Sequence, residues 1–303
     1  MSADESTAGK DEAEARSASS STRRALLQRA RQRLAAVPRQ APERTAEWLL
    51  MEVLGCNRVQ LHTRPDAPVD PEDRQQYAEW VDRRVNGEPL QHILGYTSFR
   101  GLRIEVSPDV MIPRPETEEV VGTALELIED TEAPRILDVG TGSGCIALAL
   151  KHERPDATVH ACDVSPKALQ VARSNANQLG LDICLVEADL FGDTFLDRMP
   201  GRLDLLVSNP PYIPVAEADT LSATVREYDP ARALFTRGDP LRFYWRLASV
   251  GQALCRAGGS LVLEGHADYA HDAADILRGR GMEEVRVEED VSGRPRILRG
   301  RPA

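Results

Sequence analysis

The sequence has 303 residues, of which 42% are hydrophobic and 28% charged, and its formal net charge is −11 at pH 7. At roughly 100 to 200 residues per domain, this length predicts two domains, and no stretch approaches the roughly 18 apolar residues that a membrane span requires. The acidic excess argues against a nucleic-acid substrate, because affinity for nucleic acid depends mainly on Lys and Arg side chains that neutralise phosphates.

The first 20 residues have neither the apolar run of a secretory signal nor the Arg-rich, acid-poor character of a transit peptide. We therefore predict that residues 1–20 form a disordered, acidic tail. The five cysteines include no C-x-x-C pair, and the six histidines show no metal-ligand spacing. These features predict a protein of the reducing cytoplasm that has no disulfide framework and binds no metal.

Residues 21–88 have the pattern of a small helical bundle. Apolar side chains recur with helical spacing in residues 26–34 and again in residues 46–54, and Pro71 is suited to begin a third helix. Residues 89–114 then change to alternating and β-branched residues. That change predicts a β-hairpin that links the helical domain to the rest of the chain.

Residues 115–303 alternate short apolar runs with helical patterns. Strands are expected at RILDVG, TVHACD, ICLVEA, LDLLVSN and GSLVLEG, with helices between them. Alternation of this kind predicts an α/β fold, in which a mostly parallel sheet is covered by helices on both faces. Ser165 and Pro166 are suited to begin one of these helices, and Gly180 to end it.

The first of these strands runs into a glycine-rich turn. Glycines let a ligand approach the backbone closely, and the start of the following helix offers free N–H groups. Asp163 ends the next strand, about 20 residues on, where an acidic side chain can accept both hydroxyl protons of a ribose. The G-x-G-x-G spacing favours S-adenosylmethionine over NAD as the nucleoside. The turn consists of Gly140, Thr141, Gly142, Ser143 and Gly144.

A second group of cofactor contacts is expected in residues 188–191, Ala-Asp-Leu-Phe, after the third strand. A carboxylate there could meet the amino group of an adenine, and an apolar side chain could cover the face of its ring. The same four residues also fit the start of a helix or a turn. From the sequence alone both interpretations stay open.

The strand LDLLVSN leads directly into Asn209, Pro210, Pro211 and Tyr212. In an open parallel sheet the carboxyl ends of the strands face the ligand crevice, so this loop should lie opposite the nucleoside. Two successive prolines fix φ near about −65° and remove two backbone donors. The loop should therefore be stiff and rich in carbonyl acceptors.

Such a loop suits the methylation of a nitrogen whose lone pair is delocalised into a π system. If the Asn209 side-chain oxygen and the Pro210 carbonyl each accept one N–H, they orient the NH2 group and favour a lone pair directed at the methyl carbon. Tyr212 offers a flat face on which a planar amide or base could stack. Because a sulfonium is a good leaving group, the reaction needs no nucleophilic side chain and no metal.

With both motifs present, the chain resembles the class I, Rossmann-like methyltransferases, and within them the HemK/PrmC family. The resemblance covers nearly all of residues 21–300, and its most diagnostic element is Pro-Arg-Pro-Glu-Thr-Glu at residues 113–118. The family usually has Glu where this chain has Asp229, a departure that concerns loop conformation rather than chemistry. Further matches are residues 90–101, residues 138–144, Asp163, residues 209–212, Leu263, Glu264, Asp290, Gly293 and Arg296.

The resemblance implies that S-adenosylmethionine is the methyl donor. It implies that the acceptor is the side-chain amide of the glutamine in the Gly-Gly-Gln motif of peptide chain release factors, whose body the helical domain would grip. The expected site residues are Asn209, Pro210, Pro211 and Tyr212 for the substrate, with Asn209, Pro210 and Tyr212 catalytic, and Gly140, Thr141, Gly142, Ser143, Gly144, Asp163, Leu190 and Asn209 for the cofactor.

Two other functions compete with this one. The first is a DNA or RNA amino-group methyltransferase, because the amino group of a base presents the same chemical problem to the same loop. Such an enzyme must, however, bind phosphates and flip its target base. The chain carries no dedicated basic segment for that task. A non-enzymatic adaptor that kept the fold is the second alternative, and the intact glycine turn and Asn-Pro-Pro-Tyr loop argue against it.

Several other residues are expected to have structural roles. Arg114 and Glu116 could face the substrate or pair at the start of a helix, and we favour the structural role. Cys145 and Cys162 are expected to be small buried apolar residues rather than nucleophiles. The three tryptophans lie on helical patterns and are expected in the core: Trp48, Trp80 and Trp245.

Overall fold

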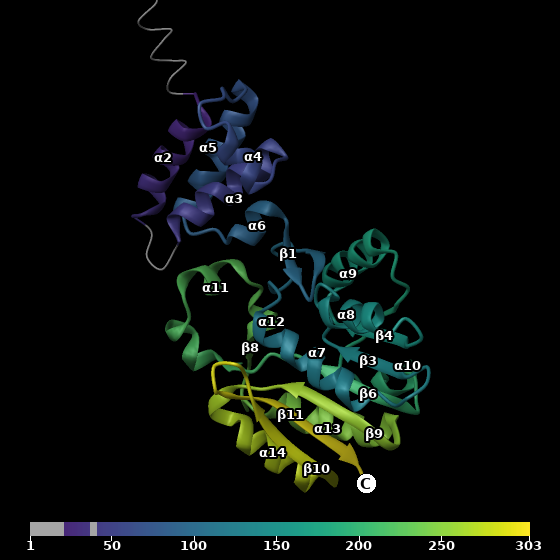
Figure 1. Cartoon of the computed structure of the whole chain (residues 1–303). Coiled ribbons are helices and arrows are strands. Elements are labelled where there is room, and N and C mark those ends of the chain that lie inside the picture. Colours follow the sequence, from purple (N-terminus) through teal and green to yellow (C-terminus); the bar gives the residue numbers. More distant parts are fainter. Residues whose placement is uncertain (1–20, 37–40) are drawn as a thin grey trace, which may run out of the picture. The chain divides into compact units, whose positions relative to one another are not determined.

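The structure, a computed structural model, describes residues 21–36 and 41–303 (Figure 1). The acidic tail expected over residues 1–20 therefore lies outside the described residues. The chain divides into two compact units, one that ends at Leu94 and one that begins at Gly95. Within the described ranges, no helix is both long and apolar enough to cross a membrane.

The N-terminal unit is a helical bundle, as its periodicity predicts. Thr22 caps the first helix by accepting a hydrogen bond from the Ala25 backbone N–H, and Gly55 ends the second with a left-handed φ of 58°. Leu34, Leu49 and Leu50 are fully buried in its core. The helices are α2 (Arg23–Leu34), α3 (Pro42–Leu54), α4 (Arg58–Thr63), α5 (Pro71–Val85) and α6 (Leu90–Leu94).

The helix α6 occupies residues where the linking hairpin was expected to begin. Ile93 is buried, and the partly buried Leu90 and Leu94 pack with it against the helical core, a spacing of three and four residues that favours a helical turn over a strand. The hairpin itself is shorter and consists of β1 (Tyr96–Phe99) and β2 (Leu102–Glu105).

Two of the three tryptophans are not core residues, contrary to expectation. Trp48 is 42% exposed and Trp245 is 39% exposed, whereas Trp80 packs partly buried against the N-terminal core. Trp48 directly precedes the buried pair at positions 49 and 50, so it lies at the edge of the buried stripe of α3. The Arg280 guanidinium covers the Trp245 ring, with its carbon 4.8 Å from the ring centroid.

The larger unit is built on a seven-stranded sheet with the strand order β10-β11-β9-β6-β3-β4-β5. Five strands are parallel, and β10 and β11 form an antiparallel hairpin at one edge. The prediction of a mostly parallel sheet is confirmed, while the edge hairpin was not predicted. The strands are β3 (Arg135–Val139), β4 (Thr158–Asp163), β5 (Cys184–Glu187), β6 (Leu203–Ser208), β9 (Cys255–Glu264), β10 (Met282–Glu289) and β11 (Pro295–Pro302).

Helices cover both faces of this sheet (Figure 1). Successive strand residues point to opposite faces, so Ile136 packs in the core under α7 and α8, while Leu137 packs in the core under α13 and α14. The helices on the first face are α7 (Pro115–Leu127), α8 (Cys145–Glu153) and α9 (Pro166–Leu179), and those on the second are α10 (Phe195–Arg198), α13 (Arg242–Leu254) and α14 (Ala270–Gly279).

Short elements follow β6 and precede α13. Ile213 pairs with Phe235 in a small parallel sheet of two strands, β7 (Ile213–Pro214) and β8 (Phe235–Thr236). Between them lie the 3-10 helix η1 (Val215–Thr220), α11 (Ala223–Tyr228) and α12 (Ala231–Leu234), and a second 3-10 helix, η2 (Ala267–Tyr269), follows β9. This segment brings Pro230, Arg232 and Ala233 to the carboxyl end of the large sheet, where they line a pocket.

Candidate active site

The pocket lies where the strand order of the sheet reverses. The chain adds β4 and β5 on one side of β3 and then crosses to add β6 and β9 on the other. A crevice forms outside the carboxyl ends of the strands at such a switch point. Val139 at the end of β3 pairs with Ser208 at the end of β6, and the Ser208 hydroxyl donates a 2.6 Å hydrogen bond to the Val139 carbonyl. The glycine turn and Asn209 therefore begin at the same level of the sheet.

Four residues of the glycine turn line the pocket, and the fifth does not. Gly140 and Gly142 have φ values of 75° and 55°, and a Cβ at either position would meet nothing within 4 Å. The space beside their backbone is therefore open to a ligand. Gly144 has a different role from the expected cofactor contact, because a Cβ there would lie 3.2 Å from side-chain atoms of both Leu148 and Ala172. Its missing side chain allows α8 and α9 to pack closely.

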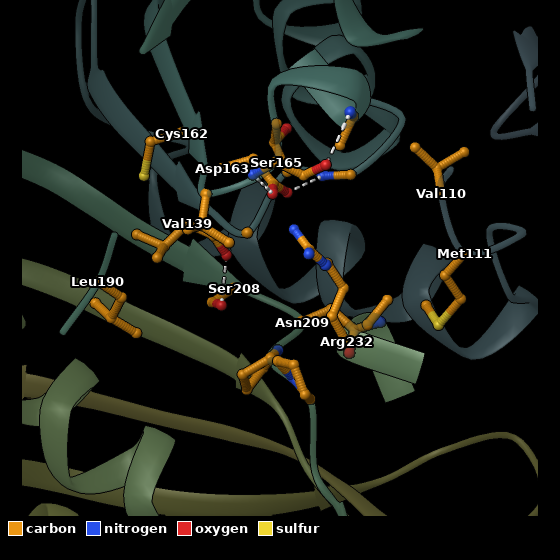
Figure 2. A pocket seen from close by; sticks show the side chains of 18 of the residues that line it. Val110, Met111, Val139, Cys162, Asp163, Ser165, Leu190, Ser208, Asn209 and Arg232 are labelled. Carbon is orange, nitrogen blue, oxygen red and sulfur yellow. Dashed lines mark hydrogen bonds between the residues drawn. The ribbon is translucent and has the colours of Figure 1, made fainter. Parts of the chain in front are cut away.

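Asp163 ends β4 at the pocket wall (Figure 2). Its Oδ2 accepts a 3.0 Å hydrogen bond from the Gly142 backbone N–H, and its Oδ1 accepts a 2.8 Å bond from that of Ser165. Each carboxylate oxygen keeps acceptor capacity for a hydroxyl. Burial raises the pKa of the Asp163 carboxyl, while these hydrogen bonds and the charge of Arg232 lower it. The geometry fits a carboxylate that binds a ribose diol.

Residues 188–191 form another part of the wall. Leu190 is buried and lines the pocket, and Phe191 lines it with 36% of its surface exposed. The Phe191 ring meets Phe243 edge-on at 5.1 Å between centroids, and the Arg242 guanidinium carbon lies 4.1 Å from its centroid. Asp189 Oδ1 accepts a 2.9 Å hydrogen bond from the Phe191 N–H. The two interpretations of this segment are thus compatible, since it forms a turn and also lines the pocket.

The Asn-Pro-Pro-Tyr loop, residues 209–212, contributes Asn209, Pro210 and Pro211 to the pocket, whereas Tyr212 is not part of its lining. The Tyr212 hydroxyl donates a 2.9 Å hydrogen bond to Glu264 Oε1, and its ring packs against the core beneath α13. Burial and the Glu264 charge raise the pKa of Tyr212 above its usual value, so the hydroxyl remains a donor. In this structure Tyr212 supports the loop and does not offer the stacking face that we expected.

Side chains from distant segments hold the loop from behind. Asn209 Nδ2 donates a 3.2 Å hydrogen bond to Thr117 Oγ1, and the Thr117 hydroxyl donates a 2.7 Å bond to Glu264 Oε2. Arg296 Nη1 lies 3.4 Å from the Tyr212 hydroxyl. Thr117 comes from α7, Glu264 from β9 and Arg296 from β11. In the sequence these three residues are marked only as parts of the family resemblance, which assigns none of them to this network.

Arg114 has a structural role, as we favoured, but it does not pair with Glu116. Arg114 instead forms an ion pair with Asp229, at 2.5 Å between Nη2 and Oδ2, and the Asp229 side chain is almost fully buried. This ion pair joins the start of α7 to the turn before α12, and α12 carries Arg232 on the pocket wall. No local sequence pattern marks Arg232 in α12 or Phe243 in α13 as a pocket residue, because the placement of these helices beside the pocket depends on tertiary contacts.

The remaining titratable groups around the glycine turn are strongly buried. Burial raises the pKa of Asp138 to about 7, although its Oδ2 accepts a 2.6 Å hydrogen bond from the Thr141 hydroxyl. Burial also raises the thiol pKa of Cys145 and of Cys162 to about 12, so both are neutral at physiological pH. They line the pocket as apolar groups, in agreement with the role expected for them.

A glycine turn, an acidic residue one strand later and a rigid loop at the switch point define a class I methyltransferase. Solved structures agree with this fold. The T. thermophilus 16S rRNA N2 G1207 methyltransferase matches with a TM-score of 0.51 and 16% identity, covering 69% of this chain and 50% of that chain. The hMettl16 catalytic domain matches with a TM-score of 0.52 and 18% identity, covering 76% and 80%. At these identities the likeness shows the fold alone.

Sequence comparison identifies the family. Residues 25–95 match the PrmC N-terminal domain, and residues 121–239 match the methyltransferase small domain. The Release factor glutamine methyltransferase of Chlorobaculum tepidum is 42% identical over 83% of this chain and 87% of its own length. Its namesake in Deinococcus radiodurans is 39% identical over 92% of this chain and 98% of its own length. The chain belongs to the release factor glutamine methyltransferase family, which confirms the predicted resemblance, and S-adenosylmethionine is its methyl donor.

Proposed function

We propose that this chain transfers the methyl group of S-adenosylmethionine to the side-chain amide nitrogen of the glutamine in the Gly-Gly-Gln motif of peptide chain release factors. The observation that carries the proposal is that Asn209 and Pro210 line the same pocket as Gly140 and Gly142. An amide acceptor and a nucleoside methyl donor can therefore meet there. The names of the relatives supply the class of acceptor.

The pocket fits the donor. Open space beside the glycine turn admits a bulky group to the backbone, Asp163 offers carboxylate oxygens to a ribose, and Leu190 with Phe191 offers an apolar wall to an adenine. When bound, S-adenosylmethionine supplies a methyl group on a cationic sulfur, which keeps the electron pair of the broken C–S bond as a neutral thioether.

Two oxygens of the loop act on the acceptor, one from a side chain and one from the backbone. The Asn209 side-chain oxygen and the Pro210 carbonyl each accept one N–H of the glutamine amide, which orients its NH2 group and favours a lone pair directed at the methyl carbon. As the N–CH3 bond forms, the nitrogen gives up one of these protons to solvent. Both oxygens stabilise the positive charge that develops on the N–H groups before that proton leaves.

The partners and location follow from this reaction. We infer that the N-terminal unit, which matches the PrmC N-terminal domain, binds the body of the release factor. We also infer that the chain acts in the cytoplasm and does not bind nucleic acid directly. The net charge of −11 supports that inference, because a nucleic-acid substrate needs neutralised phosphates. The fold alone does not decide this, since an rRNA methyltransferase shares it.

Mass spectrometry can test the proposal. A purified release factor is incubated with the full chain and isotopically labelled S-adenosylmethionine, in the presence of duplex DNA as a competing acceptor. The expected result is one labelled methyl group on the glutamine of the Gly-Gly-Gln motif and none on DNA. Label on DNA alone would keep the donor site and contradict the proposed acceptor. If neither acceptor were labelled although the donor binds, the alternative of a non-enzymatic adaptor that kept the fold would be favoured.

A further inference from the structure

The hydrogen bonds behind the catalytic loop form a chain with one direction. Glu264 is 1% exposed and accepts one bond from the Thr117 hydroxyl at 2.7 Å and another from the Tyr212 hydroxyl at 2.9 Å. Thr117, also 1% exposed, accepts a 3.2 Å bond from Asn209 Nδ2. Asn209 and Thr117 line the pocket, whereas Glu264 lies behind them and is not part of the lining.

The direction of these bonds follows from the chemistry of the groups. An ionised carboxylate can only accept hydrogen bonds, so the single O–H of Thr117 and that of Tyr212 both point at Glu264. Burial, with a smaller contribution from the Glu116 charge, raises the pKa of Glu264 above its usual value, while the bonds from Thr117 and Tyr212 and the positive charge of Arg296 oppose that rise and favour the charged form. Because the Thr117 hydroxyl donates its only proton to Glu264, it can offer only lone pairs to Asn209.

A side chain that offers only lone pairs selects one of the two orientations of the Asn209 amide. The NH2 group must face Thr117, and the oxygen must then point to the opposite side. If the amide turned over, its oxygen would face the Thr117 oxygen without a proton between them, which would leave a buried acceptor unpaired. An asparagine can accept an N–H from the substrate only through that oxygen.

We propose that Thr117 and Glu264 are positioning residues that hold the Asn209 amide oxygen toward the nitrogen to be methylated. This inference rests on the proposed function, because it assigns the oxygen of Asn209 to an amide acceptor. Glu264 acts through Thr117, and Thr117 acts through Asn209. Tyr212 shares Glu264 with Thr117, so the same carboxylate holds two residues of the Asn-Pro-Pro-Tyr loop.

Thr117→Val tests the inference because valine keeps the shape of threonine and lacks its hydroxyl. The same helix offers a matched control: Thr123 is also buried, and its hydroxyl also donates to a glutamate, Glu288, at 3.2 Å. We expect kcat to fall about tenfold or more in Thr117→Val, the scale of one unpaired buried polar group, with the dissociation constant for S-adenosylmethionine within about threefold of wild type. Thr117→Ser, which restores the hydroxyl, should return most of the lost kcat, and Thr123→Val should keep the wild-type kcat.

The outcomes separate the inference from the proposed function. All variants are assayed on the acceptor that the wild-type chain methylates. A wild-type chain that labels DNA instead of the release factor contradicts the proposed function, and the four kcat values on DNA still decide the positioning role. Equal kcat values for Thr117→Val and Thr123→Val, or a Thr117→Ser variant as slow as Thr117→Val, would overturn it.

A second variant covers the case in which Thr117→Val does not fold. Glu264→Met keeps a side chain of similar length but removes both carboxylate oxygens. Without that acceptor, the Thr117 hydroxyl can turn its proton toward Asn209, and the amide oxygen is no longer held toward the substrate. We expect a fall in kcat of about tenfold or more with the donor still bound. A Glu264→Met variant that melts like the wild type and keeps its kcat would contradict the inference.

Discussion

The two sides of the pocket are built in different ways. On the donor side, the glycine turn and Asp163 form a local unit, in which the carboxylate accepts hydrogen bonds from the backbone of Gly142 and Ser165. On the acceptor side, the side chain of Asn209 is held by Thr117, which lies 92 residues earlier in the chain, and through it by Glu264. Binding of the donor therefore depends on local backbone conformation, and orientation of the acceptor depends on tertiary contacts.

This contrast makes damage to the two sides distinguishable. A change on the donor side should alter affinity for S-adenosylmethionine. A change on the acceptor side should lower the rate of transfer from a donor that is still bound. Five substitutions, in order of decreasing expected effect, test whether the division is as sharp as the structure suggests.

Asn209→Ala should have the largest effect. The substitution removes the acceptor oxygen, and loss of one preorganised polar group of this kind lowers kcat by about 100- to 1,000-fold. Affinity for S-adenosylmethionine should change little, because the glycine turn and Asp163 remain. Single-turnover transfer from labelled donor gives the rate, and calorimetry gives the affinity. A variant with a near-wild-type rate would exclude the catalytic role of Asn209.

Asp163→Ala should act on the donor side alone. Loss of hydrogen bonds to a charged group weakens binding by roughly 1–3 kcal/mol, which is about 5- to 150-fold in the dissociation constant. The transfer rate at saturating donor should stay close to that of the wild type. Isothermal titration calorimetry with S-adenosylmethionine measures the first quantity. Unchanged affinity would contradict the assignment of Asp163 to the ribose.

Gly144→Ala separates packing from binding within the glycine turn. A non-glycine residue at a φ of 83° is strained by about 1–2 kcal/mol, and the new Cβ would also crowd Leu148 and Ala172. We expect a lower free energy of unfolding in urea and a nearly unchanged donor affinity for the folded protein.

Gly142→Ala is the matched comparison for that variant. Its φ of 55° is also left-handed, but its Cβ would enter the open space of the pocket. This variant should therefore weaken donor binding as well as stability. If both alanines weakened binding equally, Gly144 would be a cofactor contact after all, as the sequence first indicated.

The same division between local and tertiary contacts decides which features could be predicted from the sequence. The parallel strands, the glycine turn, Asp163 and Asn209 were found because each is marked by residues that are neighbours in the chain. Thr117 carries no local mark of its role, since its partner Glu264 lies 147 residues away. Tyr212 was assigned to the substrate because the partner of its hydroxyl, Glu264, lies 52 residues away on β9, and Arg232 was missed because no neighbouring residue in the chain marks its place on the pocket wall.

The fold shows the same limit in its less regular parts. The edge hairpin of β10 and β11 was not predicted, because the residues of β10 do not alternate cleanly between buried and exposed. Trp48 was placed in the core because helical spacing tells which residues share a face but not how wide the buried stripe is. Strong local periodicity therefore predicted α2, α3 and α5, whereas the elements that depend on neighbouring segments required the structure.

Asp138→Asn should have the smallest effect on donor affinity and on the transfer rate, because Asp138 is not part of the pocket lining and asparagine keeps an oxygen that can accept the hydrogen bond from Thr141. The variant is instead recognised by how its free energy of unfolding changes with pH, compared with that of the wild type. Burial raises the pKa of Asp138 from 3.8 to about 7, so between these values the folded state holds a proton that the unfolded state has lost. Stability of the wild type should therefore fall as pH rises through this window and level off above it. Urea unfolding without donor, from pH 5 to pH 8, should show the variant gaining stability relative to the wild type as pH rises. Parallel curves would mean that Asp138 is already ionised in the folded protein, and that the donor side of the pocket carries a buried charge before any ligand binds.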